Sequence, residues 1–276
     1  MGLRIATNLA SERVQAHLKQ NSRKTDKSLE QLASGKRIIS ASDDAAGMAI
    51  ANTMRAQTRS LRQAGRNAND GISMIQTAEG SLTEISNVLV RLRELSIQSA
   101  SDTVGELERT MLNLEYQQLV SEIDRIADST EYNGVQLING EGKDLYDFHV
   151  GPKGGESNVI QFDASNTNVK SDSLELSGST IEYKSDAADS IENIDRAITI
   201  LSQQRAGLGA IQNRLHSAVS TIEIQSVQQD YARSIIEDVD VAEASSKLAK
   251  NTITKNAAIA ALAQANSIPV RAVNLI

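Results

Sequence analysis

Apolar residues recur at helical spacing over most of this chain, and the clearest series begins at Leu61. A seven-residue repeat has two columns of apolar or small residues: Leu61, Ala68, Ile75, Leu82 and Leu89, and Ala64, Gly71, Ala78, Ile85 and Leu92. A repeat of this kind, kept for about five heptads, predicts a left-handed coiled-coil seam. Each of Gly65, Gly71 and Gly80 costs about 1 kcal/mol relative to Ala inside a helix. Because the repeat keeps its phase across all three glycines, we predict one continuous helix.

A matching column lies in the C-terminal half, where helical spacing returns at about Asp186 and is broken only at Gln229. Two long helices that share such columns can pack against each other in opposite directions. The predicted intrachain seam consists of Leu61, Ala68, Ile75, Leu82, Ile85, Leu89, Leu92, Ile194, Leu201, Leu208, Leu215 and Ile222.

Between these helices the spacing predicts a shorter helix over about 106–127 and then a change of period. Turn signals stand at 132–134 and 138–140. Apolar residues then alternate with polar ones on both sides of the turn at 151–158, namely Tyr146, Phe148, Val150, Ile160, Phe162 and Ala164. Alternation around a glycine-rich turn predicts a small β-hairpin region within 130–183.

Both ends of the chain carry apolar helical arms with few charges. The first arm is predicted as a helix over 3–33 that Gly35 ends, and Ser40 and Ser42 are expected to cap the next helix ahead of Asp43 and Asp44. The last arm has only Arg271 as a charge between 256 and 276. Apolar faces of this kind need a protein partner. We predict self-assembly through Ile5, Leu9, Val14, Leu18, Leu29, Leu32, Leu248, Ile259, Leu262, Ile268, Val273 and Leu275.

Composition favours slim helices over a compact enzyme core. The 276 residues include no Trp, two Phe and no Cys, so the large side chains that fill most globular cores are scarce. The three histidines, His17, His149 and His216, are far apart in sequence, and no serine stands in a nucleophile-elbow sequence. We therefore expect no enzyme activity, no cofactor and no metal.

The net charge of −7 is uneven, because residues 1–66 hold 12 Lys/Arg and 5 Asp/Glu. A basic arm can serve nucleic acid, but without aromatic residues or a dense basic cluster there, charge complementarity within or between subunits is favoured. Polar residues interrupt the last arm short of the roughly 20 apolar residues that a membrane span requires. No cleavable signal peptide is recognisable in the first residues. We expect no nucleic-acid partner and no insertion in a membrane.

The fold class that follows is mainly α, a long antiparallel helical coiled-coil rod with a small β-hairpin region and with the N- and C-terminal helices paired. Residues 1–42 are predicted to form the N-terminal arm of a domain of paired terminal helices, and 236–276 its C-terminal arm. Residues 43–183 supply the N-terminal helices and β-hairpin region of a rod domain, and 184–235 supply its returning helix.

Several segments resemble bacterial flagellin closely and in the order of that family. They are LASGKRIISASDDAAGMAIA at 32–51, RNANDGISMIQTAEGSLTEI at 66–85, EIDRIADSTEYNGVQLING at 122–140, GLGAIQNRLHSA at 207–218 and RSIIEDVDVAEASSKLAKNTI at 233–253. The resemblance covers about four-fifths of the chain and omits mainly the β region. It implies the inner-tube and rod domains of a flagellin, without large outer domains because the middle of the chain is short. The start MGLRIATN at 1–8 and the tail IPVRAVNLI at 268–276, with its added Arg271, depart from the commoner pattern of the family. These departures affect the details of subunit contacts there.

The resemblance implies a structural subunit that polymerises into the extracellular flagellar filament for swimming. It also implies as partners the flagellar export apparatus, a flagellin chaperone, and the filament cap and hook-junction proteins. A hook–filament junction protein and, less favoured, a coiled-coil adaptor are the alternatives.

The resemblance further implies a contact with a vertebrate Toll-like receptor through Arg91, Leu95 and Glu122. By the heptad phase, Arg91 and Leu95 are expected to flank the seam on one helical face, with Glu122 as the acidic partner on the next helix. The alternative is that these residues serve packing between subunits.

Overall fold

The computed structural model describes residues 8–141 and 145–273, which divide into two compact units. Unit 1 combines Met1–Ala56 with Gln228–Ile276, and unit 2 is Gln57–Val227. The domain boundaries expected from the sequence, between residues 42 and 43 and between 235 and 236, remain predictions.

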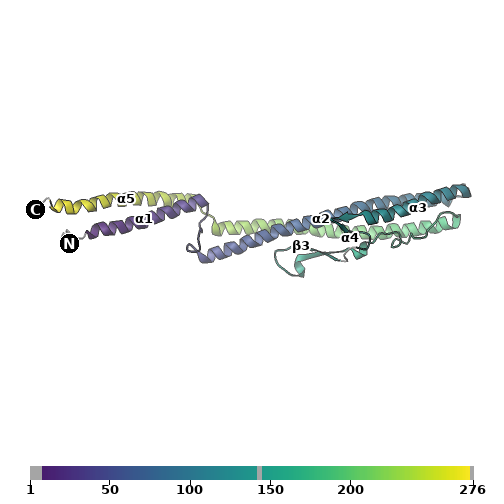
Figure 1. Cartoon of the computed structure of the whole chain (residues 1–276), viewed down its shortest axis with the longest axis horizontal. Helices are drawn as coiled ribbons and strands as arrows, with labels where there is room; N and C mark the ends of the chain where they lie inside the picture. Colours follow the sequence, from purple (N-terminus) through teal and green to yellow (C-terminus); the bar gives the residue numbers. More distant parts are fainter. Residues whose placement is uncertain (1–7, 142–144, 274–276) are drawn as a thin grey trace. The chain divides into compact units, whose positions relative to one another are not determined.

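Unit 1 pairs the first and last helices. The helices α1 (Leu9–Ser34) and α5 (Val241–Val273) lie side by side in Figure 1. They run in opposite directions, because Asn8 meets Ala265 at one end and Ser28 meets Asn251 further along. Gly35 ends α1 with a φ of 69°, the left-handed conformation in which glycine carries no steric penalty.

The start of α2 (Ala45–Ser99) differs from the prediction in its cap. Asp44 Oδ1 accepts a hydrogen bond from the Gly47 amide at 2.9 Å, whereas the hydroxyls of Ser40 and Ser42 bond to each other at 2.7 Å. The expectation of hydroxyl caps is therefore wrong. A carboxylate at this place satisfies a free amide and also interacts favourably with the helix dipole.

Unit 2 has a core between α2, α3 (Glu106–Ser129) and α4 (Lys184–Glu237). The helix α2 is continuous through Gly65, Gly71 and Gly80. All twelve residues of the predicted seam are buried. Ile222 packs with Leu61 and Ala64, while Asp195 pairs with Arg93, so α2 and α4 run antiparallel.

Two small hairpins lie between α3 and α4. The strands β1 (Glu131–Tyr132) and β2 (Val135–Gln136) pair across Asn133 and Gly134, whose φ values are 52° and 76°. Positive φ at both positions is the two-residue turn that suits a twisted hairpin.

The strands β3 (Leu145–His149) and β4 (Val159–Asp163) form the second hairpin. Tyr146 stands opposite Phe162 with the ring centroids 5.9 Å apart. Two single turns of 3-10 helix, Glu156–Asn158 and Ser165–Thr167, flank β4. The predicted alternation is confirmed, since Ile160 and Phe162 are buried while Gln161 is exposed. Among the helices that the structure describes, none combines the length and the apolar character needed to cross a membrane.

Candidate assembly surfaces of the terminal helices

The seam between α1 and α5 mixes small, polar and apolar side chains. Among the residues whose burial the structure describes, five are buried, namely Ser11, Thr25, Ser28, Ala244 and Ala265. Five larger apolar residues continue the same spacing and are half-buried, namely Val14, Leu18, Leu32, Leu248 and Leu262. Hydrogen bonds fix their register. Asn8 Nδ2 donates to the Ala265 carbonyl at 2.9 Å, and Asn251 Nδ2 donates to Ser28 Oγ at 3.2 Å. Each such bond contributes only about 1 kcal/mol net, so these bonds set the register of the two helices more than they stabilise the pair.

Five other large apolar side chains of the pair face outward. Between 49% and 68% of the residue surface is exposed for Leu9, Leu29, Val241, Ile253 and Ile259. Of the other residues predicted for self-assembly, the structure leaves these partly exposed: Val14, Leu18, Leu32, Leu248 and Leu262. The side chains of Ile5, Ile268, Val273 and Leu275 are outside the described residues. The five exposed apolar side chains of α1 and α5 need another chain to bury them.

A cluster of charges holds the connection between α1 and α2 against the end of α4 in unit 1. Glu237 Oε1 accepts from Lys36 Nζ at 2.5 Å and from Arg55 Nη2 at 2.6 Å, and Arg233 Nε lies 3.9 Å from Oε2. The Glu237 carbonyl also accepts from the Arg37 amide at 2.7 Å. We call these residues, Lys36, Arg55, Arg233 and Glu237, the Glu237 clamp.

The electrostatics of the clamp favour the ionised carboxylate. The hydrogen bond from Lys36 lowers the pKa of Glu237, and Arg55 lowers it further against the opposing effect of burial. Only 8% of the Glu237 side chain is exposed. A buried carboxylate with two close cations is well satisfied, but removing either side would leave a costly unpaired charge.

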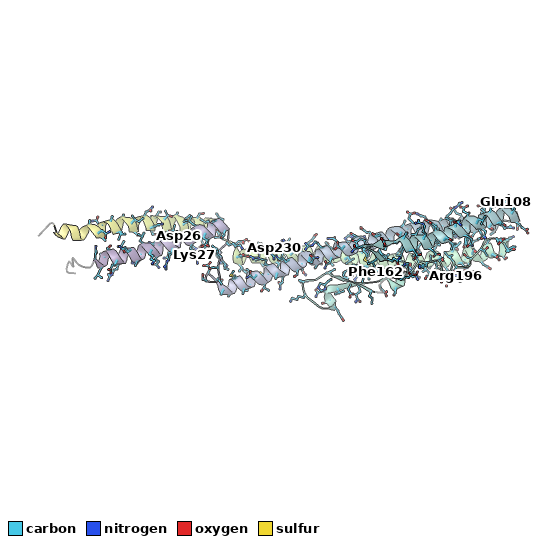
Figure 2. The ribbon with its side chains drawn as sticks, viewed as in Figure 1. Asp26, Lys27, Glu108, Phe162, Arg196 and Asp230 are labelled. Atoms are coloured by element: carbon cyan, nitrogen blue, oxygen red, sulfur yellow. The ribbon has the colours of Figure 1, made fainter. Side chains whose placement is uncertain are left out.

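A second ion pair joins α1 to the connecting loop. Asp43 Oδ1 lies 2.5 Å from Lys27 Nζ, a residue labelled in Figure 2, and Asp43 Oδ2 accepts from the amides of Ile39 and Ser40. The Lys27 hydrogen bond, with help from these two amides, lowers the pKa of Asp43 to about 2. Asp43 therefore shapes the loop, while Asp44 caps the helix.

The residues predicted for receptor contact are not arranged as expected. Leu95 is fully buried, so the expectation that it lies beside the seam is wrong. The physical reason is that α2 is covered on two sides, because α3 places Tyr116 and Ile123 in the same core as α4.

The assignment of Glu122 as the acidic receptor contact stays a prediction, and within the chain Arg91 pairs with another carboxylate. Arg91 Nη2 lies 2.8 Å from Glu115 Oε1 on α3, whereas Glu122 binds Arg125 one turn along its own helix at 2.6 Å. Arg91 and Glu122 remain at the surface, with 48% and 39% of their side chains exposed.

Sequence reasoning missed the polar residues that position the terminal helices. Ile236 lies in the same heptad column as Ile194, and Glu237 comes directly after it. The periodicity of apolar residues therefore does not distinguish Glu237 from a solvated residue. Asn251 and Ser28 are likewise ordinary surface residues in sequence. Only the pairing of α1 with α5 brings them together. Within the described residues, no group of three or more histidines, aspartates or glutamates is placed to hold a metal ion.

Family models and known relatives show which protein family this chain belongs to. The family model of the bacterial flagellin N-terminal helical region matches residues 5–143, and that of the flagellin C-terminal helical region matches 191–276. The chain is 39% identical to a flagellin of Halalkalibacterium halodurans over 269 residues, which cover 98% of each chain. It is 35% identical to the flagellar filament core protein flaB2 of Brachyspira hyodysenteriae, with 99% of each chain covered.

A solved structure supports the same family. The crystal structure of Bacillus cereus flagellin superimposes with a TM-score of 0.51 at 28% identity, covering 57% of this chain and 88% of that one. More than half of this chain therefore shares its fold with a flagellin of known structure. The chain belongs to the bacterial flagellin family.

Proposed function

We propose that copies of this chain polymerise into a helical filament through the outward faces of α1 and α5. As a flagellin, the chain is a structural subunit of the flagellar filament. The observation that carries the proposal is the exposure of large apolar side chains on the outer faces of the helix pair. Leu29 and Ile253 are 49% and 68% exposed in the single chain. A contact between different faces of identical subunits does not close, so it extends into a helical array.

Truncation tests the proposal. Deletion of residues 256–276 should leave a soluble, partly helical monomer that does not polymerise under conditions in which the full chain forms filaments. Electron microscopy after mild precipitation reads the result. Normal filaments from the truncated chain would overturn the proposal.

A point variant tests the apolar surface of α5 without shortening the helix. Ile253→Ser removes an exposed apolar side chain, and Thr254→Ser removes one methyl group at the neighbouring position. The first should raise the protein concentration needed for polymerisation and the second should not. Equal behaviour of the two variants would contradict the role given to Ile253.

We also propose that the subunit passes through the flagellar export apparatus before it joins the extracellular filament. A flagellin chaperone would cover the apolar face of α5 before export, and the cap and hook-junction proteins would adjoin the finished polymer. Support comes from family membership and from the exposure of Ile253 and Ile259 in the single chain. Hydrogen exchange with the chaperone present should protect α5 more than α3. Equal protection of the two helices would contradict this assignment.

A further inference from the structure

We infer that Asn133 is a site of slow self-modification, at which the side-chain amide is lost and aspartate or isoaspartate remains. The chain holds two Asn-Gly pairs, Asn133 with Gly134 and Asn139 with Gly140. Glycine after asparagine favours this chemistry, because no Cβ hinders approach to the glycine nitrogen. The fold exposes the first pair and restrains the second. The inference goes beyond the proposed function, since it concerns the chain before polymerisation.

Asn133 and Gly134 form the exposed two-residue loop between β1 and β2. Asn133 has a φ of 52°, in the left-handed region that asparagine enters more readily than most residues. The strand ladder closes between Tyr132 and Val135, so the Gly134 amide lies outside its hydrogen bonds. Among the described residues, no hydrogen-bond partner engages the Asn133 carboxamide. Neither of the two reacting groups is therefore held in place by such a bond.

The loop can change its conformation at low cost. The strands β1 and β2 have only 2 residues each, and a hairpin with so short a ladder opens locally more easily than the helices that flank it. Attack on the side chain requires rotation about the Cα–C bond of Asn133. Because the loop is exposed and weakly restrained, this rotation does not require the core of unit 2 to unfold.

The reaction uses only the chain and water. The Gly134 amide nitrogen gives up its proton to solvent base and attacks Cγ of Asn133. A new N–C bond closes a cyclic imide, while the C–N bond of the carboxamide breaks and ammonia leaves with a proton from solvent. Water then adds to either imide carbonyl and opens the ring. Opening on one side leaves aspartate, and opening on the other leaves isoaspartate, in which the main chain runs through Cβ and Cγ.

The second pair has the same sequence but is held in place. Asn139 is only 2% exposed. Its Nδ2 donates to Gln136 Oε1 at 2.5 Å, and its Oδ1 accepts from the Glu141 amide at 3.0 Å. The Val169 amide donates to the carbonyl of Ile138 at 3.0 Å, which fixes the main chain just before it. The carboxamide must break its own hydrogen bonds before it can turn toward the next amide nitrogen, so the fold protects Asn139.

The two products differ in their effect on the hairpin. Aspartate fits the turn, because it tolerates the left-handed conformation much as asparagine does. Isoaspartate adds a carbon to the main chain and therefore disturbs the pairing of β1 with β2. Either product adds a negative charge two positions after the exposed Glu131. Since the loss of ammonia is not reversed, the converted fraction rises with the time since the chain was made.

Peptide mapping by mass spectrometry tests the assignment on the full chain, kept folded and unpolymerised at mildly alkaline pH. We expect aspartate and isoaspartate to form at position 133 more than about 25-fold faster than at position 139. Two hydrogen bonds must open at Asn139, and each lowers the open population about fivefold. Water enriched in heavy oxygen should label the product, because ring opening takes its oxygen from water. Equal rates at the two positions of the folded chain, or no conversion at Asn133, would overturn the inference.

The same chain unfolded in urea is the matched control, because it keeps both Asn-Gly pairs and removes the fold. The two rates should then become similar, mainly through faster conversion at Asn139. A difference that persists in urea would assign the selectivity to the flanking sequence and contradict the structural argument. None of these results depends on polymerisation, so they leave the proposed function to its own tests.

A point variant tests the protection of Asn139 within the folded chain. Gln136→Ala removes the acceptor of the Asn139 carboxamide and should raise conversion at Asn139 about fivefold. The rate at Asn133 should stay unchanged, which reports that the hairpin is still folded. Gln117→Ala, which removes a hydrogen bond to the Ser179 carbonyl from α3, is the control and should alter neither rate. An unchanged rate at Asn139 in Gln136→Ala would contradict the role given to this hydrogen bond.

Discussion

Arg55 and Glu237 lie 182 positions apart in sequence and form an ion pair with Nη2 and Oε1 separated by 2.6 Å. Lys36 reaches the same carboxylate oxygen from the loop after α1. One carboxylate thus connects the loop, the start of α2 and the end of α4 within unit 1. This arrangement explains how a region with few buried apolar side chains keeps a defined structure.

Replacing Glu237 with Gln should destabilise unit 1. The amide keeps the shape of the side chain but leaves Lys36 and Arg55 without their counter-charge. Since both cations are partly exposed, we expect a loss of about 1–2 kcal/mol, less than for a fully buried pair. Urea unfolding followed by circular dichroism measures it. Glu243→Gln, which breaks an exposed pair with Lys247, is the control. A loss no larger than that of the control would contradict the clamp.

Acid should weaken unit 1 through Asp43. The pKa of Asp43 is lowered from 3.8 to about 2 in the folded chain by Lys27 and the two amides. A lowered pKa means that the ionised group stabilises the fold above the unfolded-state value, and that this contribution is lost as the pH falls toward 2. The difference in melting temperature between the wild type and Asp43→Asn should therefore shrink as the pH falls from 3.8 to about 2. A constant difference between pH 6 and 2 would contradict the assignment.

The seam of unit 2 should respond to side-chain volume. Leu82 is fully buried, and Leu82→Ala should cost about 2–5 kcal/mol because it removes apolar contacts and leaves a cavity. Val90 is half exposed on the same helix, so Val90→Ala should change stability by less than about 0.5 kcal/mol. Urea midpoints of the two variants, compared at equal slope, test the contrast. Similar losses would mean that Leu82 is not part of a packed core.

Two glycines of α2 should behave in opposite ways when replaced by Ala. A Cβ at Gly80 meets nothing within 4 Å, so Gly80→Ala should stabilise the helix by about 1 kcal/mol. A Cβ at Gly71 would lie 2.9 Å from the Phe148 ring, so Gly71→Ala should lose that gain and destabilise the hairpin contact. Thermal unfolding of both variants decides the question. A clear increase in melting temperature for Gly71→Ala would contradict the packing of Phe148 on α2.

The flagellin resemblance implies receptor recognition of the dissociated subunit, and we propose that this recognition uses the surface residues Arg91 and Glu122. Arg91→Ala should lower receptor signalling several-fold, because a guanidinium at the surface can bind a carboxylate or carbonyl in a partner. Arg93→Ala, which removes a similar exposed ion pair with Asp195, is the matched control. Unchanged signalling by Arg91→Ala would leave only a packing role.

The sequence predicted the long helices because heptad spacing records a seam that one helix makes with one other. The same method failed at Leu95, since α3 covers a second side of α2 and the heptad columns describe only one. The turn at Asn133 and Gly134 was predictable because its two positive φ values restrict the residues that fit. The α1–α5 seam was not, because Ser28 and Asn251 acquire their role only through contact across 223 positions.

We expect the outward apolar side chains of α1 and α5 to become buried between copies in the filament. Helical reconstruction of the filament by electron cryomicroscopy shows the surroundings of Leu29, Ile253 and Ile259. Each of these side chains should pack against α1 or α5 of a neighbouring copy. Filaments in which the three side chains face water would rule out assembly through these faces.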